Sequence, residues 1–345
     1  MTRRLLFVAT LVLLLVAGVA GCSSSAEVVS HWPAADQERV VAKPAEPPRW
    51  PLSGLDAPST DALSQRVVSV KIENSPDARP QTNLQLADVV YESVTEGGIT
   101  RFNAIFHSQS PKVVGPVRSA RLSDLYIVPQ YHALFCFSGA SSSVNSRVNA
   151  AGIENLSEDN GITKPFTRST KRPRPHNLYA DINEVRAEGA RRDMKTSLGI
   201  TGLAFERRAS EATPTITKVS IPFSPANKVD WTYDEDTKTY LRANNGRAFT
   251  DEGTGKQLAA RNVVVMWAQH KVASRDKVGS TTYEIVLTGT GRASVFRGGQ
   301  RFDGTWEATK DAPPVFKAED GTQIKLAPGN TWMQVINTSV NIAME

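Results

Sequence analysis

Two arginines at the start of a predicted helix are the residues of this chain that most clearly suggest binding chemistry. Arg118 and Arg121 stand three residues apart in GPVRSARLSD, and the pattern after the proline predicts a helix over Ser119–Gln130. This spacing places both on one helix face. A helix N-terminus already carries free N–H groups and a partial positive charge, so arginines there are favourable only beside a negative group. The two arginines are therefore predicted to meet negative charge.

The source of that negative charge has two interpretations. It is internal if the arginines pair with carboxylates of the chain, which lock the helix to the sheet; the candidates are Asp88, Glu92, Glu96 and Asp124. It is external if they bind a phosphate or carboxylate of a ligand. In that case Arg101, at the predicted hairpin, and His176 and Asn177, in a proline-rich loop, supply further hydrogen bonds to the ligand. The predicted anion site then comprises Arg101, Arg118, Arg121, His176 and Asn177.

Enzyme motifs give little support to catalysis. The chain has no H-E-x-x-H, no G-x-S-x-G and no glycine-rich phosphate loop. One S-x-x-K match, Ser274 to Lys277, lies in a charged stretch that predicts a loop. Glu92 and Glu96 could form a carboxylate pair, but their even spacing on a strand favours a salt-bridged sheet face beside Arg101.

Histidine and cysteine usage predicts neither a metal nor a cofactor. The five histidines have no metal-ligand spacing; they are His31, His107, His132, His176 and His270. The two cysteines are Cys22 and Cys136, and Cys136 lies in the apolar run HALFCFSG. That run predicts a buried strand, where a small hydrophobic role is favoured over a nucleophile.

The N-terminus has the pattern of a lipoprotein signal peptide. A short basic segment, Met1–Arg4, precedes the apolar Leu5–Val16, and Val19-Ala20-Gly21-Cys22 matches the bacterial lipobox. Residues 1–21 are predicted to be removed, and Cys22 to carry a diacylglyceryl group with further acylation. Two or more acyl chains anchor stably. The protein is thus predicted on the extracytoplasmic face of the cell membrane.

Composition predicts a tether followed by two folded domains. Residues 22–62 are rich in serine and proline and have no sustained periodicity, as expected of a flexible tether. The rest is long enough for two domains. A net charge of +5 falls to +3 without Arg3 and Arg4, which favours anionic envelope polymers or headgroups as partners. No nucleic-acid motif is present.

The two predicted domains differ in class, and together they make an α+β protein. Residues 65–207 alternate strand and helix patterns, with a hairpin over 86–108 and helices over 140–152 and 181–199. They predict an α/β layered sandwich with a mixed sheet. Residues 213–345 have short strand patterns between turns and predict a smaller all-β barrel or sandwich. There, Trp306 and Trp332 each follow a turn and are expected in the core.

Several long motifs resemble those of the YerB-like lipoproteins. They are ENSPDARPQTNLQLADVVYESVTEGGITRFNAIF, VGPVRSAR, RPHNLY and, in the second domain, FDGTW and DGTQIKLAPGNTW. The resemblance covers both domains, roughly residues 65–340. It implies a secreted, lipid-anchored, two-domain protein whose two domains have no assigned function, so any activity must be inferred from the residues.

Two functions follow from these observations. The first is a membrane-anchored lipoprotein that binds an anionic envelope ligand, such as a wall glycan, a teichoic-type polymer or a lipid headgroup, through an arginine-lined cleft. The second is a phosphotransferase or hydrolase on such a polymer, with His176 as the acid/base group. The absence of a nucleophile or metal motif favours the first.

Overall fold

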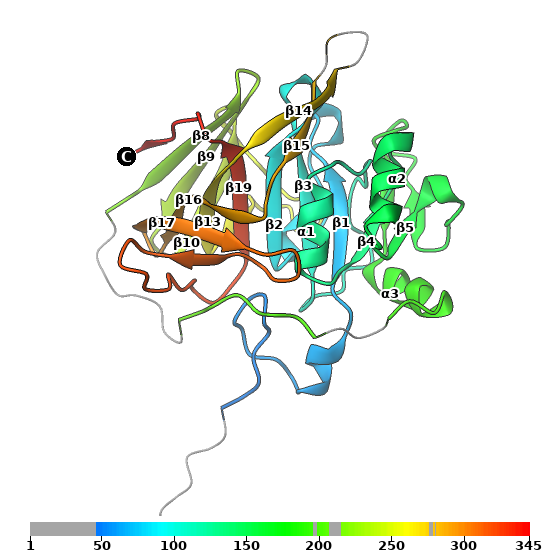
Figure 1. The fold of residues 1–345 in the computed structure, drawn as a ribbon, viewed down its shortest axis with the longest axis horizontal. Helices are drawn as coiled ribbons and strands as arrows, with labels where there is room; N and C mark the ends of the chain where they lie inside the picture. The colour runs from blue at the N-terminus through cyan, green and yellow to red at the C-terminus, as the bar shows by residue number, and fades with distance from the viewer. Residues whose placement is uncertain (1–45, 196–198, 207–214, 276–278, 280) are drawn as a thin grey trace, which may run out of the picture. The chain divides into compact units, whose positions relative to one another are not determined.

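A ten-stranded mixed sheet runs through the structure, a computed structural model that describes residues 46–195, 199–206, 215–275, 279 and 281–345 (Figure 1). Residues 46–345 form one compact unit. The predicted signal peptide and Cys22 lie outside the described residues. The sheet consists of β1 (Val68–Glu73), β2 (Val89–Val94), β3 (Thr100–Phe106), β4 (Leu134–Phe137), β5 (Asn155–Ser157), β13 (Asn262–Ala268), β16 (Gly289–Arg297), β17 (Gln300–Ala308), β18 (Val315–Lys317) and β19 (Thr331–Asn337).

The order of strands in this sheet joins distant parts of the chain. It runs β18-β17-β16-β13-β19-β2-β3-β1-β4-β5, so five strands from each predicted domain share one sheet. The junction is a parallel pairing of β19 with β2, in which Thr331 faces Val89 and Val335 faces Ser93 (Figure 1). The predicted hairpin is confirmed, because β2 and β3 pair antiparallel.

A second large sheet and two small two-stranded sheets complete the β-structure of the described residues. The six-stranded sheet contains β8 (Lys218–Ser224), β9 (Asn227–Asp234), β10 (Thr239–Asn244), β11 (Arg247–Ala248), β12 (Ala259–Ala260) and β20 (Ala343–Met344). Two further hairpin pairs are β14 (His270–Arg275) with β15 (Thr281–Ile285) and β6 (Phe166–Arg168) with β7 (Leu178–Ala180). The described C-terminal part has no α-helix, and the α+β prediction with an all-β C-terminal part is confirmed.

Three α-helices lie among the described residues, namely α1 (Asp124–Gln130), α2 (Ser142–Ala150) and α3 (Ile182–Arg191). All are shorter than predicted; α2 and α3 begin within two residues of their predicted starts, whereas α1 begins later than predicted. Asp181 caps α3, as predicted, by accepting hydrogen bonds from the N–H groups of Asn183 and Glu184. The helix ends well before Gly199, and Asp193 has a left-handed φ of 55°. Within the described residues no helix has the length and apolar character needed to span a membrane.

The prediction that Arg118 and Arg121 start a helix is wrong. The Arg118 N–H donates to the Lys71 carbonyl at 2.8 Å, which keeps this segment extended beside β1. The Arg121 N–H donates to the Asp124 carboxylate at 2.7 Å, and the Asp124 N–H bonds back to the Arg121 carbonyl. This reciprocal turn delays α1 until Asp124, so helix polarity gives no reason for the arginines.

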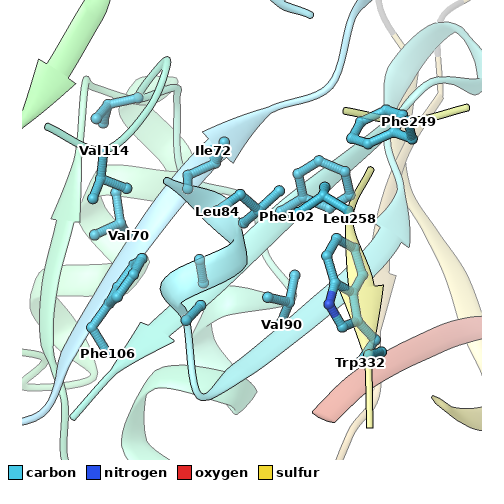
Figure 2. Close-up of a cluster of buried hydrophobic side chains, with 14 of the residues drawn as sticks. Val70, Ile72, Leu84, Val90, Phe102, Phe106, Val114, Phe249, Leu258 and Trp332 are labelled. Carbon is cyan, nitrogen blue, oxygen red and sulfur yellow. The ribbon is translucent and has the colours of Figure 1, made fainter. Parts of the chain in front are cut away.

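Apolar side chains pack on both faces of the large sheet. One cluster lies between this sheet and the six-stranded sheet, and it joins the two predicted domains (Figure 2). In it, Phe102 of β3 and Trp332 of β19 meet edge to face at 5.4 Å between ring centroids. The other cluster packs α1 and α2 on the opposite face and includes Trp306. Both tryptophans are buried, which confirms their predicted core role.

Residues 46–62 do not continue the tether that their prolines predict. Leu52 is fully buried, and the Trp50 ring packs edge-on against His107 at 4.9 Å between centroids. Burying two large apolar side chains favours an ordered segment over a solvated one. The folded unit therefore extends to Glu46, and the tether boundary predicted at residue 62 is too far along the chain.

Candidate functional site

Strand β1 alternates strictly between apolar and polar side chains. Val68, Val70 and Ile72 enter the cluster shared with the six-stranded sheet, whereas Ser69, Lys71 and Glu73 point to the other face. All three polar residues are buried. Such burial is costly unless each polar group finds a partner, so this face of β1 must be matched by polar groups from neighbouring elements.

The most deeply buried of these polar contacts is an ion pair between Lys71 and Asp124. The Lys71 ammonium lies 2.7 Å from Asp124 Oδ1, with 1% and 0% of the two side chains exposed. Asn103 donates to the same Oδ1 at 3.1 Å and accepts from Ser69. Burial lowers the pKa of Lys71, and the Asp124 carboxylate opposes that effect. This row of hydrogen bonds fixes β1, β3 and the start of α1 together.

Glu73, at the end of β1, binds two of the residues that the sequence singled out. The Arg118 Nε lies 3.2 Å from Glu73 Oε1, and His176 Nδ1 lies 3.0 Å from Oε2. The carboxylate is 2% exposed. Three motifs far apart in the sequence, ENSPDARPQ, VGPVRSAR and RPHNLY, thus meet at one carboxylate. Glu73 was not among the partners predicted for Arg118.

Arg121 has an internal partner that the sequence did predict. Its Nε donates to Glu96 Oε2 at 2.8 Å and its Nη2 lies 2.7 Å from the same oxygen. Burial raises the pKa of Glu96, but its pairing with Arg121 outweighs that effect and the net shift is downward. Both side chains keep partial exposure, 18% for Arg121 and 27% for Glu96. The pair therefore lies at the edge of the buried region.

Arg101 stands between these pairs without a carboxylate partner. Among the described residues it forms no ion pair, its Nη1 reaches only the Ser119 carbonyl at 3.4 Å, and its buried Nε has no hydrogen-bond partner. Yet it is only 6% exposed. Burial, followed by repulsion from Arg121, lowers the pKa of Arg101 to about 9. We name the group the arginine cluster; it contains Glu73, Glu96, Arg101, Arg118, Arg121 and His176.

Asn177 is bonded elsewhere. Its Oδ1 accepts from Arg168 Nη1 at 2.8 Å, and its Nδ2 donates to the Ser169 carbonyl at 2.8 Å. Arg168 in turn pairs with Glu158. The amide of Asn177 therefore holds the chain between β6 and β7, and the structure brings together four of the five predicted residues but not this one.

The predicted carboxylate face of Glu92, Glu96 and Arg101 does not form. β2 ends at Val94, and Glu96 lies in a short 3-10 turn whose Gly97 has a φ of 69°. Glu92 faces Phe102 in the β2–β3 register, so it points to the opposite side from Arg101. There it pairs with Arg242, and both side chains are fully buried. The prediction from the even spacing is wrong because β2 ends between Glu92 and Glu96, so the two side chains do not lie on one strand.

Two further candidates from the sequence are Cys136 and the Ser274–Lys277 match. Cys136 is fully buried, and burial raises the pKa of its thiol, as a structural strand residue requires. Ser274 lies on the exposed strand β14, and Lys277 is outside the described residues. No group of three or more histidine, cysteine, aspartate or glutamate side chains could hold a metal ion among the residues that the structure describes.

Sequence reasoning missed two members of this buried network, Glu73 and Lys71, although it did name Asp124 as a candidate partner of the arginines. Both missed residues are less than 3% exposed. The available signal was the alternation in VSVKIE, where charged residues occupy the second face of a central strand. Charged residues on a strand with both faces covered indicate a paired polar network.

Comparisons with known proteins identify the family. The model of the N-terminal domain of a protein of unknown function (DUF3048) matches residues 52–195, and the model of its C-terminal domain matches residues 219–333. The chain is 27% identical over 303 residues to the putative lipoprotein YerB of Bacillus subtilis (strain 168), covering 87% of this chain and 89% of that protein.

A solved structure shows the same fold. The crystal structure of YerB protein from Bacillus subtilis matches with a TM-score of 0.76 and 28% identity, covering 86% of this chain and 99% of that one. These matches confirm the resemblance that the motifs indicated. With its N- and C-terminal models together spanning most of the sequence, the chain belongs to the DUF3048 family of proteins of unknown function.

Proposed function

We propose that this chain is a lipid-anchored envelope protein whose arginine cluster binds an anionic group, a phosphate or a carboxylate, of a cell-envelope ligand. The observation that carries the proposal is Arg101, a nearly buried guanidinium without a carboxylate partner among the described residues. A buried charge is costly unless it is paired. An external anion would supply the missing partner.

The charge balance around Arg101 supports this proposal. Near the Glu73 end of β1, four cationic side chains face only three carboxylates among the described residues. The cations are Lys71, Arg101, Arg118 and Arg121, and the carboxylates are Glu73, Glu96 and Asp124. Arg118 and Arg121 stay partly exposed while each is paired with a glutamate, so both guanidinium groups can also contact an anion that binds from solvent. Guanidinium groups suit phosphate and carboxylate because their N–H groups match paired oxygens.

Replacing Arg101 by glutamine is expected to weaken anion binding at least about tenfold, because a charge-assisted hydrogen bond is lost. The unfolding midpoint should stay within a few degrees or rise, since no carboxylate is stranded. Calorimetric titration with poly(glycerol phosphate), and sedimentation with phosphatidylglycerol vesicles, measure binding to the two ligand sources. Arg301, an exposed arginine paired with Asp303, provides the matched Arg301→Gln control.

Unchanged binding by Arg101→Gln to both probes would contradict the anion site. Arg118 is a poorer probe for this purpose. Its removal weakens the pairing of Glu73, which is 2% exposed, so lower stability and lower binding would be confounded.

The lipid anchor is proposed from the lipobox at Cys22 and from the relative named as a putative lipoprotein. Acylation there would hold the unit on the extracytoplasmic face of the membrane. Cys22→Ala should move the protein from the membrane fraction to the soluble fraction, because the acyl chains supply the anchoring energy. Immunoblots of fractionated cells measure this. A variant that still sediments with membranes after a salt wash would show that another segment holds it.

A second candidate function is hydrolysis or transfer on the same anionic polymer. Its support is the 3.0 Å contact between His176 Nδ1 and the Glu73 carboxylate. A carboxylate only accepts, so Nδ1–H donates and Nε2 is left as the base. Turnover of bis(4-nitrophenyl) phosphate by the wild type that disappears in His176→Gln would favour this function. Equal background hydrolysis by both would argue against it.

A further inference from the structure

A cavity of about 550 Å³ lies beside the turn that carries Glu96. It opens at the ends of the parallel strands β2 and β19, and β8 and the β14–β15 hairpin contribute the other walls. The volume falls within the range of small-molecule sites, roughly 300–1,000 Å³. Its described lining residues include Gly97, Gly98, Phe223, His270, Tyr283 and Asn337.

The chemistry of this lining differs from that of the arginine cluster. None of the described lining residues is a lysine, arginine, aspartate or glutamate. Phe223 and Tyr283 offer aromatic surface, and Val335 and Ile336 of β19 add aliphatic surface. The described part of the lining combines aromatic rings with a few polar groups and carries no charged side chain, which favours an uncharged amphipathic ligand.

His270 is a lining residue of this cavity and carries a ring nitrogen without a partner among the described residues. Its Nδ1 lies 3.0 Å from the Ala268 carbonyl, which can only accept, so Nδ1 carries the proton. Burial lowers the pKa of His270, so the ring is neutral at pH 7. Its Nε2 is therefore a lone-pair acceptor, and this atom is buried with no hydrogen-bond partner in the structure. An unsatisfied buried acceptor calls for a donor.

Asn337 supplies a donor. Its Oδ1 accepts from the Ser339 N–H at 3.1 Å and from the Ser339 hydroxyl at 3.0 Å, which fixes the orientation of the amide. The Nδ2 group forms no hydrogen bond with any described residue. The cavity lining thus holds an unused donor as well as an unused acceptor. A hydroxyl group, which both donates and accepts, satisfies either one.

We infer that this cavity binds an uncharged hydroxylated ring, as found in one sugar residue of a glycan. The aromatic side chains suit the apolar face of such a ring, while His270 Nε2 and Asn337 Nδ2 bond its hydroxyl groups. A saturated acyl chain would leave both polar groups unpaired at a cost. The chemistry of the lining therefore favours a sugar over a lipid tail.

The position of the cavity extends the proposed function, on which this step rests. Glu96 pairs with Arg121, and the next residues in the chain, Gly97 and Gly98, line the cavity. Thr282 of the β14–β15 hairpin also donates to Glu96 Oε1 at 3.2 Å. One turn thus separates the anion site from the neutral site. An anionic glycan, with a sugar in the cavity and its charge at the arginines, would occupy both.

The test is a calorimetric titration of the full-length protein, kept in detergent, with the neutral trimer of N-acetylglucosamine as the probe. His270→Phe removes the acceptor and keeps the ring. Asn337→Asp keeps the Oδ1 that holds Ser339 and removes the donor. Each variant is expected to bind the trimer at least about tenfold more weakly than the wild type, as loss of a hydrogen bond to a ligand hydroxyl predicts. Their unfolding midpoints should change by only a few degrees.

Arg101→Gln separates this inference from the proposed function. It should bind the neutral trimer as the wild type does, while losing affinity for poly(glycerol phosphate). The inference is overturned if the wild type does not bind the trimer at millimolar concentration, or if both cavity variants bind it unchanged. It is also overturned if dodecanoate binds the wild type and is lost in His270→Phe while the trimer is not bound, because the cavity would then hold an acyl chain.

Discussion

Glu92→Gln is expected to destabilise the folded unit by about 3–5 kcal/mol, the usual cost of leaving a buried charge without its partner. Glu92 accepts from Arg242 Nη2 at 2.8 and 3.0 Å, and neither side chain has any exposed surface. The pair joins β2 to β10 of the six-stranded sheet. Its loss therefore weakens the contact between the two parts of the chain.

The surroundings of Arg242 explain why it cannot escape to water when Glu92 is removed. Its guanidinium lies 3.9 Å from the centre of the Phe249 ring, and Phe102, Trp231 and Trp332 surround it further out. Its Nε and Nη1 have no hydrogen-bond partner in the part of the chain that the structure describes. Aromatic faces attract the cation, but they replace neither the carboxylate nor a hydration shell.

Urea unfolding followed by circular dichroism measures the effect of this substitution. Glu307→Gln provides the matched control, because Glu307 pairs with Lys317 while 47% of its side chain is exposed. Such a surface pair is worth about 0–1 kcal/mol. The double variant Glu92→Leu with Arg242→Met should recover most of the lost stability, since no buried charge remains. A loss below about 1 kcal/mol in Glu92→Gln would show that Arg242 finds another partner.

Asp124→Asn is expected to cost a similar amount, about 3–5 kcal/mol at neutral pH, because it strands the Lys71 ammonium in the core. Asp124 also accepts from Asn103 and from the Arg121 N–H, and the asparagine can keep only part of these bonds. The substitution therefore acts on β1, β3 and the turn before α1 at once.

The pH dependence of this variant identifies the stranded charge. Burial lowers the pKa of Lys71 below its ordinary 10.5, and removal of the carboxylate lowers it further. Between the lowered folded pKa and 10.5, the native state binds fewer protons than the unfolded state, so stability rises with pH. The deficit of Asp124→Asn relative to the wild type should narrow as the pH is raised toward 10. A deficit that stays constant between pH 7 and about pH 9 would assign the loss to packing and not to Lys71.

The local elements could be predicted from the sequence because their signals are local. The β2–β3 hairpin follows from two β-branched runs around Gly97-Gly98, and α3 from its capping residue Asp181. The burial of Cys136 follows from the apolar run around it, and that of Trp306 and Trp332 from their positions directly after turns between predicted strands. The boundary of α1 was not predicted, because it depends on the Arg121–Asp124 turn and on a hydrogen bond from Arg118 to β1, and no local pattern encodes the position of β1 beside this segment.

The candidate site was predicted only in part, for the same reason. Residue types indicated an anion site and identified Glu96 as a partner for Arg121. They did not indicate that Glu73 binds both Arg118 and His176, since these residues lie up to 103 positions apart in the chain. The feature that distinguishes Arg101 is that it lacks a carboxylate partner among the described residues. The sequence cannot indicate this, because it depends on which side chains the folded sheet places next to Arg101.

The parallel pairing of β2 with β19 has a consequence for how the chain folds after synthesis. β19 spans Thr331–Asn337, so the edge of β2 that it covers stays unpaired until the chain has been made through residue 337. Pairings of such long sequence separation form slowly, and an open strand edge recruits other strands in the meantime. A protein secreted as an extended chain, as the signal sequence predicts for this one, would have to be shielded from self-association until its last strands leave the translocon. We therefore expect the N-terminal half made alone to aggregate, and its solubility to be restored by co-expression of the C-terminal half.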